Sequence, residues 1–186
     1  MRKIRDFNMR LPFKEIRRRV LRGSPAPAGH DDARLLALLQ RAEKALKPSV
    51  LFDSFGPDSP ETASLAPIPG VAHTLAVTTL GPAFAPALDE LRTDAPSYQK
   101  ALEAAAAVAG ERSVQFVLSL IKDDVEDERC DLSPIQYLDD PEALSRVLAK
   151  LDGAKIGVSQ EAGALAPSFS RAFCVSWIAR KGRRGA

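Results

Sequence analysis

The sequence predicts an α+β fold with a mixed or antiparallel sheet and long helices. Short runs rich in β-branched and aromatic residues are separated by stretches of helical periodicity, and the two kinds of segment do not alternate strictly, as they would in a parallel α/β sheet. The chain has 186 residues, of which 45% are hydrophobic and 27% charged. These values are ordinary for a globular protein and provide enough apolar material for one core.

The N-terminal segment predicts a basic amphipathic helix. Pro12 suits the first turn of a helix, apolar residues follow at helical spacing, and Gly23 is a natural stop. A Pro-, Ala- and Gly-rich stretch comes next. We therefore expect a basic helix and linker at 1–29, an α+β domain at 30–180 and a basic tail at 181–186.

Helix and strand signals divide the predicted domain. Asp31 or Asp32 can cap the first helix, Pro48 closes it, and Gly81-Pro82 separates a buried strand from the next helix. In chain order we expect a helix at 31–46, a strand at 50–55, an irregular connection at 56–70, a strand at 71–80, helices at 81–91 and 97–125, a helix at 140–153, and strands near 156–158 and 173–178.

Charge and cysteine content limit the function classes. The net charge of +2 is too small to indicate a nucleic-acid partner. Lys14, Arg17 and Arg18 share one side of the predicted basic helix that follows Pro12. This side is either a solvated face or a surface that steers a protein partner.

No run of about 18 apolar residues predicts a membrane span. Cys130 and Cys174 are far apart, so we expect reduced thiols in a cytoplasmic protein and no metal site.

The last third of the chain carries the most specific pattern. It contains three segments at fixed offsets, Asp131-Leu132-Ser133-Pro134-Ile135-Gln136-Tyr137, Lys155-Ile156-Gly157-Val158-Ser159-Gln160-Glu161 and Leu165-Ala166-Pro167-Ser168-Phe169-Ser170. This series resembles the end of the activation (reactivation) domain of vitamin B12-dependent methionine synthase and of its stand-alone relatives. The resemblance extends over roughly residues 15–180, where Thr78-Thr79-Leu80-Gly81 and the alanine-rich stretch from Ala101 to Leu120 match the family in order.

The resemblance implies a function and a set of ligand-binding residues. The family domain binds S-adenosylmethionine and supports reductive methylation of inactive cob(II)alamin. The implied partners are a corrinoid-dependent methyltransferase, which holds the cobalamin, and a flavodoxin- or ferredoxin-type electron donor. The implied cleft is built from Asp131, Ser133, Pro134, Tyr137, Glu161, Pro167, Ser168 and Ser170.

The chain departs from the family signature of an Arg, three residues, Gly-Tyr and a Cys-Pro-x-His run. Asp131, Ile135 and Gln136 stand at the matching positions, and Leu138-Asp139-Asp140-Pro141 replaces the last run. An Arg fork would suit the ligand's carboxylate, and Gly would permit close backbone approach. A module that retains the fold but binds a protein or small ligand without S-adenosylmethionine is therefore the alternative.

Several of these residues also have structural interpretations. Tyr137 can be a half-buried aromatic residue, Glu161 a loop cap, and Ser168 and Ser170 can bind turn backbone. In the apolar strands, we expect His73 to be a hydrogen-bonded core residue and Trp177 to pack in the core or at an interface. No catalytic grouping is apparent from the residues themselves.

Overall fold

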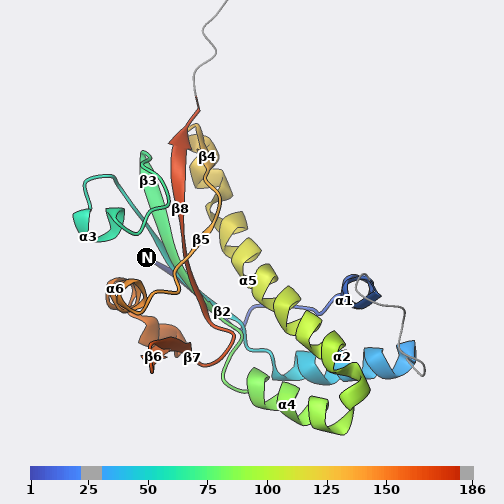
Figure 1. The fold of residues 1–186 in the computed structure, drawn as a ribbon. Coiled ribbons are helices and arrows are strands. Elements are labelled where there is room, and N and C mark those ends of the chain that lie inside the picture. The colour runs from blue at the N-terminus through green and yellow to red at the C-terminus, as the bar shows by residue number, and fades with distance from the viewer. Residues whose placement is uncertain (22–30, 181–186) are drawn as a thin grey trace, which may run out of the picture.

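The computed structural model describes residues 1–21 and 31–180. The predicted linker at 24–29 and tail at 181–186 lie outside the described residues. The fold is α+β, as predicted, with an antiparallel sheet and long helices (Figure 1). In chain order the elements are β1 (Arg2–Arg5), α1 (Phe13–Leu21), α2 (Asp32–Ala45), β2 (Ser49–Phe55), α3 (Pro60–Ala63), β3 (Ala72–Thr79), α4 (Phe84–Asp94), η1 (Pro96–Tyr98), α5 (Gln99–Asp127), β4 (Cys130–Leu132), β5 (Gln136–Tyr137), α6 (Pro141–Leu151), η2 (Gly153–Ile156), β6 (Ser159–Glu161), β7 (Ala164–Ala166) and β8 (Arg171–Ala179).

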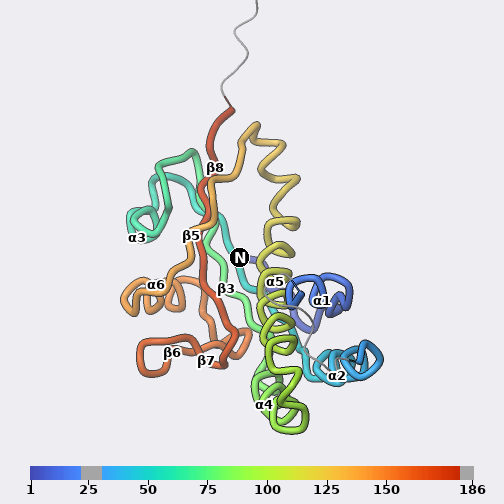
Figure 2. Tube along the Cα trace, turned by 45° about the vertical axis from the view of Figure 1, so that its right-hand side comes forward, coloured from blue at the N-terminus to red at the C-terminus, as the bar shows by residue number. Residues whose placement is uncertain are grey.

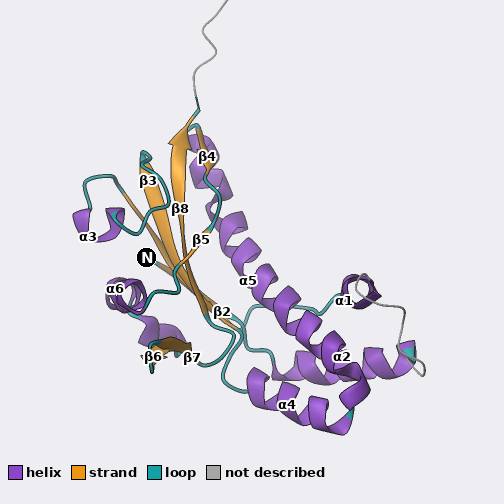
Figure 3. Cartoon of the chain, viewed as in Figure 1, coloured by secondary structure: helices purple, strands orange, loops and turns teal. Residues whose placement is uncertain are grey.

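The sheet is organised around β8. Its order is β1-β2-β3-β8-β4, and β5 also pairs with β8 (Figure 3). Every pairing is antiparallel. β3 occupies one edge of β8 over most of its length, while β4 and β5 share the other edge one after the other. The short hairpin of β6 and β7 forms a separate two-stranded sheet.

Helices cover both faces of the sheet (Figures 1 and 2). Side chains alternate between the two faces along each strand. Val50 and Phe52 of β2 pack in the cluster that contains Val117 and Ile121 of α5. Leu51, between them, packs in the cluster formed with α6. The result is a three-layer arrangement, with α5 on one face and α6, η2 and the β6–β7 hairpin on the other.

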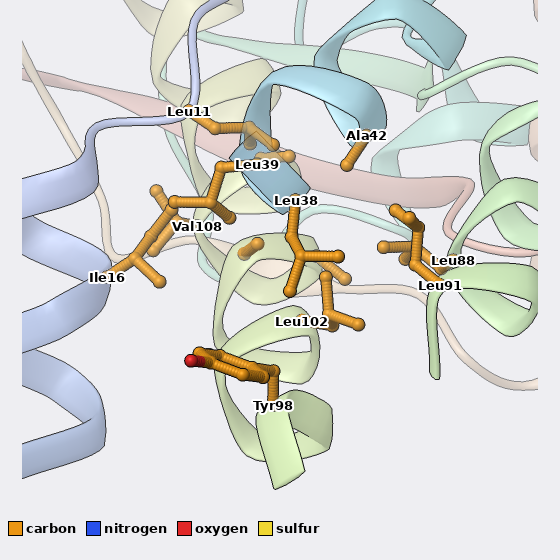
Figure 4. Packing of buried hydrophobic residues seen from close by; sticks show 14 of the residues in the cluster. Leu11, Ile16, Leu38, Leu39, Ala42, Leu88, Leu91, Tyr98, Leu102 and Val108 are labelled. Carbon is orange, nitrogen blue, oxygen red and sulfur yellow. The ribbon is translucent and has the colours of Figure 1, made fainter. Parts of the chain in front are cut away.

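A second core joins α1, α2, α4 and the first half of α5 (Figure 4). Ile16 and Leu39 are almost fully buried, and they face Leu102 and Val108 of α5 in this core. Small alanine side chains on this half of α5 allow the helices to pack closely. α5 therefore links the helical core to the sheet.

The length and apolar character of α5 bear on the membrane question. The segment Pro96–Asp127 is long and apolar enough to cross a membrane by length and composition, although half of its most apolar window is buried inside the domain. The core helix of a soluble protein has the same properties, so this segment is weak evidence for a membrane span. The first half of α5 packs in the helical core and the second half packs against the sheet, which explains the apolar composition of the helix.

Most predicted elements are confirmed, with boundaries shifted by a few residues. Asp31 caps α2 by accepting a hydrogen bond from Ala33 N–H at 2.9 Å. The predicted strand near 156–158 is wrong, because η2 continues to Ile156 and Gly157 then takes a positive φ of 70°. That left-handed conformation, which glycine adopts readily, redirects the chain so that strand β6 begins only at Ser159. β1, β4, β5 and β7 are additional strands that the sequence did not indicate, and the connection predicted as irregular at 56–70 contains the short helix α3.

Candidate functional site

The Ser-Pro-x-x-Tyr segment forms the free edge of the sheet beside β8. Ser133 fixes the turn between β4 and β5, because its N–H donates to Ser176 O and its hydroxyl oxygen accepts from Ser176 N–H, both at 2.9 Å. The Ser133 hydroxyl in turn donates to Pro134 O at 2.9 Å. Ser133 is 7% exposed, so its position supports the turn.

Tyr137 lies at the end of this edge with its ring partly exposed. It pairs with Phe173 of β8, and the two rings meet edge to face with centroids 6.5 Å apart. The guanidinium carbon of Arg171 lies 5.6 Å from the Tyr137 ring centroid, which is a cation–π distance. These contacts anchor Tyr137 on β8. Because 41% of its surface is exposed, the side chain remains accessible to a ligand.

A hollow of about 460 Å³ opens beside Tyr137, between β5, the start of α6 and the end of α3. Its volume lies within the range of about 300–1,000 Å³ that is typical of small-molecule sites. It is lined by Ser64, Leu65, Gln136, Tyr137, Leu138, Asp139, Asp140, Glu142, Ala143 and Arg146. We call this feature the Tyr137 hollow.

The Tyr137 hollow is acidic. Asp140 caps α6 by accepting from Ala143 N–H at 3.0 Å, so one of its oxygens is engaged. Asp139 and Glu142 are exposed, and neither side chain forms an ion pair with a described residue. Arg146 donates to Glu61 O at 2.7 Å and to the Ser64 hydroxyl, which ties α6 to α3. The remaining carboxylates suit a small cationic ligand such as an amine or a sulfonium.

The other predicted site residues lie elsewhere along β8. Asp131 forms an exposed ion pair with Arg180 at 2.9 Å and pairs in register with Ile178, whereas Tyr137 pairs with Phe173. These two β8 positions are five residues apart, which corresponds to about 17 Å along a strand. Asp131 and Tyr137 therefore do not converge on one small ligand. Pro134 continues the edge turn between them.

The residues of the third motif also spread over the hairpin and its exit. Glu161 is exposed at the end of β6, where its carboxylate accepts from the Ser159 hydroxyl at 3.3 Å. Pro167 follows a cis peptide bond, and Ser168 is exposed in the turn before β8. Ser170 donates to Pro167 O at 2.7 Å, which confirms its expected bond to turn backbone.

Ile135 lies in the edge segment between Ser133 and Tyr137. Its side chain is partly buried and packs against the core cluster that contains Phe173, Val175 and Trp177. Trp177 itself is 6% exposed and donates from its indole N–H to the Thr74 hydroxyl at 2.9 Å, so its predicted core role is confirmed. At this point of the sheet edge, the Ile135 side chain lies where a glycine would leave its backbone open to a ligand.

The His73 imidazole and the two cysteine thiols are buried. His73 is 3% exposed, and its Nε2 lies 2.8 Å from the Thr62 hydroxyl, as expected for a core histidine. Burial lowers the pKa of His73 and raises the pKa of the Cys174 thiol to about 12, so both are neutral at neutral pH. Both cysteines are buried free thiols. Among residues 1–21 and 31–180, no group of three His, Cys, Asp or Glu side chains could hold a metal ion.

Sequence reasoning identified Tyr137 but missed most of the Tyr137 hollow. The acidic run Asp139-Asp140-Pro141-Glu142 at a helix start was the available signal. Ser64 and Arg146 are distant in sequence and come together only when α3 docks on α6.

In comparisons with known proteins, no family model matches the sequence and no curated protein matches it.

Proposed function

We propose that this chain is a cytoplasmic reactivation module for a corrinoid-dependent methyltransferase, most directly methionine synthase. The observation that carries the proposal is the ordered resemblance from residue 15 to 180, which ends in the Ser-Pro-x-x-Tyr, Gly-Val and Pro-Ser-x-Ser series. The α+β architecture with a long alanine-rich helix is consistent with it. The buried His73 and Cys174 side chains are not placed to act as catalytic groups, which is consistent with an accessory protein.

The chemistry would belong to the partner and to the bound ligand. The partner's cobalamin would supply the methyl-accepting chemistry, for which a flavodoxin- or ferredoxin-type donor would provide one electron and S-adenosylmethionine the methyl group, with S-adenosylhomocysteine as the by-product. The task of this chain is to bind S-adenosylmethionine and orient its methyl group towards the partner. A binding surface that orients a reactant lowers the entropic part of the barrier.

The Tyr137 hollow supports the ligand part of the proposal. S-adenosylmethionine carries a sulfonium and an ammonium group, and Asp139 and Glu142 supply negative charge at the hollow. The Tyr137 side chain is 41% exposed beside these carboxylates, although the Arg171 guanidinium already lies over its ring. Arg146 is the one cation among the described lining residues, and its contacts to Glu61 and Ser64 hold it against α3.

Two observations favour a second candidate, in which the chain binds a protein or another small ligand without S-adenosylmethionine. Ile135 fills the place where the family has Gly, and Asp131, which replaces the family's Arg, is paired with Arg180. A buried β-branched side chain prevents close backbone approach of a ligand. Asp131 would repel the ligand's carboxylate.

Calorimetry with S-adenosylmethionine distinguishes the two candidates. We expect saturable binding that weakens when Asp139→Asn and Glu142→Gln are combined, because the hollow loses both free carboxylates. Asp123→Asn with Asp127→Asn, on an exposed part of α5, is the matched control and should leave the affinity unchanged. With a Kd near 10 μM, a hundredfold excess of ligand should stabilise the protein by roughly 2.7 kcal/mol.

A genetic test addresses the partner. A strain that depends on the B12-dependent methionine synthase should need added methionine for normal growth once this gene is deleted. Unaffected growth without methionine would argue against both the partner and the reactivation role. A growth defect combined with no S-adenosylmethionine binding would favour the second candidate.

A further inference from the structure

A second hollow, of about 320 Å³, lies at the end of the sheet where β1 ends and α4 is about to begin. Four side chains with donor groups line it, namely Arg5, Lys47, Ser49 and Thr79. It is separate from the Tyr137 hollow, with which it shares no lining residue. We call it the Ser49 hollow.

Strand register directs three of these side chains to one face. Arg5 of β1 lies opposite Ser49 of β2, and Ser49 lies opposite Thr79 of β3. Residues opposite each other in antiparallel strands project from the same face of the sheet. Leu51, two residues after Ser49, packs in the cluster beneath α6, so this face is the one covered by α6 and η2. η2 packs against both β1 and β2 and closes the hollow with Ala154 and Ile156.

The hydroxyl of Ser49 lacks a partner in the described part of the chain. Ser49 is 6% exposed, and its hydroxyl forms no hydrogen bond with residues 1–21 or 31–180. Thr79 is held in place, since its hydroxyl oxygen accepts from Gly81 N–H at 3.2 Å and its hydroxyl donates to the Ser170 hydroxyl oxygen, 3.0 Å away, whose own proton goes to Pro167 O. The Ser49 oxygen still reaches solvent in the hollow, because the only buried side-chain nitrogen or oxygen without a partner among the described residues is Arg92 Nε, so the hydroxyl is free to donate to a ligand oxygen there.

Two cations border the same space. Neither Arg5 nor Lys47 forms an ion pair or side-chain hydrogen bond with a described residue. Lys47 is fixed beside the hollow because its N–H donates to Leu80 O at 3.0 Å and because Gly81, at φ 92°, approaches it closely. A Cβ at Gly81 would lie 3.0 Å from Lys47 Cβ. Asp6 is the single carboxylate among the described lining residues, so the lining carries a net positive charge.

We propose that the Ser49 hollow binds the phosphate group of a small phosphomonoester. Arg5, Lys47 and Ser49 supply donors from three separate segments, and a phosphate offers three strong acceptor oxygens and nearly two negative charges. A carboxylate has one oxygen fewer and a single charge. The volume exceeds that of a phosphate alone and lies at the lower end of the range for small ligands, about 300–1,000 Å³. The apolar wall of Ala154, Ile156 and Pro82 accommodates a small organic body.

Calorimetric titrations with glycerol 3-phosphate, inorganic phosphate and acetate at constant ionic strength test the assignment. We expect glycerol 3-phosphate to bind most tightly and acetate most weakly. Arg5→Gln and Lys47→Gln should each weaken phosphate binding at least about tenfold, the loss expected for one charge-assisted hydrogen bond. Ser49→Ala should weaken it by several-fold. Lys44→Gln, which removes an exposed lysine near the end of α2, is the matched control and should have no effect.

Each contrary result overturns a defined part of the proposal. Absence of saturable phosphate binding, or binding that survives both Arg5→Gln and Lys47→Gln, removes the site. Acetate binding as tightly as phosphate overturns the phosphate assignment, and equal affinities for inorganic phosphate and glycerol 3-phosphate overturn the phosphomonoester. Arg5→Gln changes a residue of strand β1 and could therefore impair folding. Lys47 lies in the connection between α2 and β2, so Lys47→Gln tests the hollow without changing a strand residue.

Discussion

Arg19 of α1 binds both carboxylate oxygens of Glu111 on α5, with nitrogen–oxygen distances of 2.8 and 2.6 Å. The same guanidinium also contacts Glu15 of its own helix at 3.0 Å, and Arg112 reaches Glu15 at 3.1 Å. This group of charges holds the first helix on the long helix, above the buried Ile16. The N-terminal helix is therefore part of the packed domain.

We expect Arg19→Met to lower the free energy of unfolding by about 1 kcal/mol at low salt, because the Arg19–Glu111 pair is only partly exposed and has two-point geometry. The loss should shrink as salt is raised, since ions screen accessible pairs. Arg18→Met, which removes an exposed neighbour without an ion pair, is the control. Urea unfolding at two salt concentrations measures both effects, and equal stabilities of the two variants would contradict the prediction.

The same pair should respond to acid. The Arg19 guanidinium lowers the pKa of Glu111 below its ordinary value of 4.5. A carboxylate with a lowered folded-state pKa stabilises the fold above its unfolded pKa, and this stabilisation is lost as pH falls through the folded value. The difference in stability between wild type and Glu111→Gln should therefore be full at pH 6 and decrease below pH 4.5. A difference that is independent of pH would contradict the role of the charge.

His73 should make the protein less stable in mild acid. Burial lowers its folded-state pKa below 6.5, so the unfolded chain binds a proton more readily and stability falls as pH drops below 6.5. His73→Gln keeps a group that can reach the Thr62 hydroxyl but removes the titration. The decrease in unfolding free energy from pH 7 to 5.5 should be smaller in this variant. An identical decrease in both proteins would assign the effect to other groups.

Gly70 and Gly56 flank the irregular segment that carries α3. The two positions should differ sharply in how well they tolerate substitution by alanine. A Cβ at Gly70 would overlap the carbonyl oxygen of Trp177, which accepts the N–H of Val71 at 2.9 Å. Gly70→Ala should therefore cost about 1–3 kcal/mol of stability. Gly56 has no atom within 4 Å of such a Cβ, and Gly56→Ala should be neutral or stabilise by up to about 1 kcal/mol. Thermal unfolding of the two variants provides the comparison.

The exposed cations of α1 should govern encounter with an acidic protein partner. Lys14, Arg17 and Arg18 are all exposed, as predicted, but Arg17 pairs with Asp32 at 2.9 Å. If the proposed methyltransferase is the partner, the combination of Lys14→Glu and Arg18→Glu should slow association with it while folding stays nearly intact. The wild-type rate should fall as salt rises, since screening acts beyond about 8 Å at physiological ionic strength. Equal low-salt rates in stopped-flow experiments would mean that this side is only solvated.

The helices and long strands could be predicted because their own residues specify them. β8 is mostly apolar, with Ser176 as the one polar residue after Arg171, and α6 begins with an Asp cap followed by Pro141. β1 could not be predicted, since Arg2-Lys3-Ile4-Arg5 contains one apolar residue and its pairing with β2 relies on main-chain hydrogen bonds. The predicted strand at 156–158 failed because a local pattern of apolar residues does not reveal the left-handed turn at Gly157.

The candidate sites depend on tertiary contacts that local patterns do not encode. Tyr137 was a predicted ligand residue only through the family resemblance of the Ser-Pro-x-x-Tyr segment, but the Tyr137 hollow forms only where Arg146 of α6 contacts the α3 segment. Likewise, Ser49 is an ordinary strand residue until register places it between Arg5 and Thr79. Strand register and helix docking are therefore the missing information.

The central place of β8 has a consequence for biosynthesis. β1, β2 and β3 emerge from the ribosome early and can pair with one another, but β3 then exposes an open edge while α4, α5 and α6 are synthesised. β4 and β5 have no strand partner until β8 appears. An unpaired strand edge is prone to wrong associations. The nascent chain should therefore depend on chaperones until Arg171–Ala179 has left the exit tunnel, and truncations that remove this strand should aggregate rather than yield a smaller folded domain.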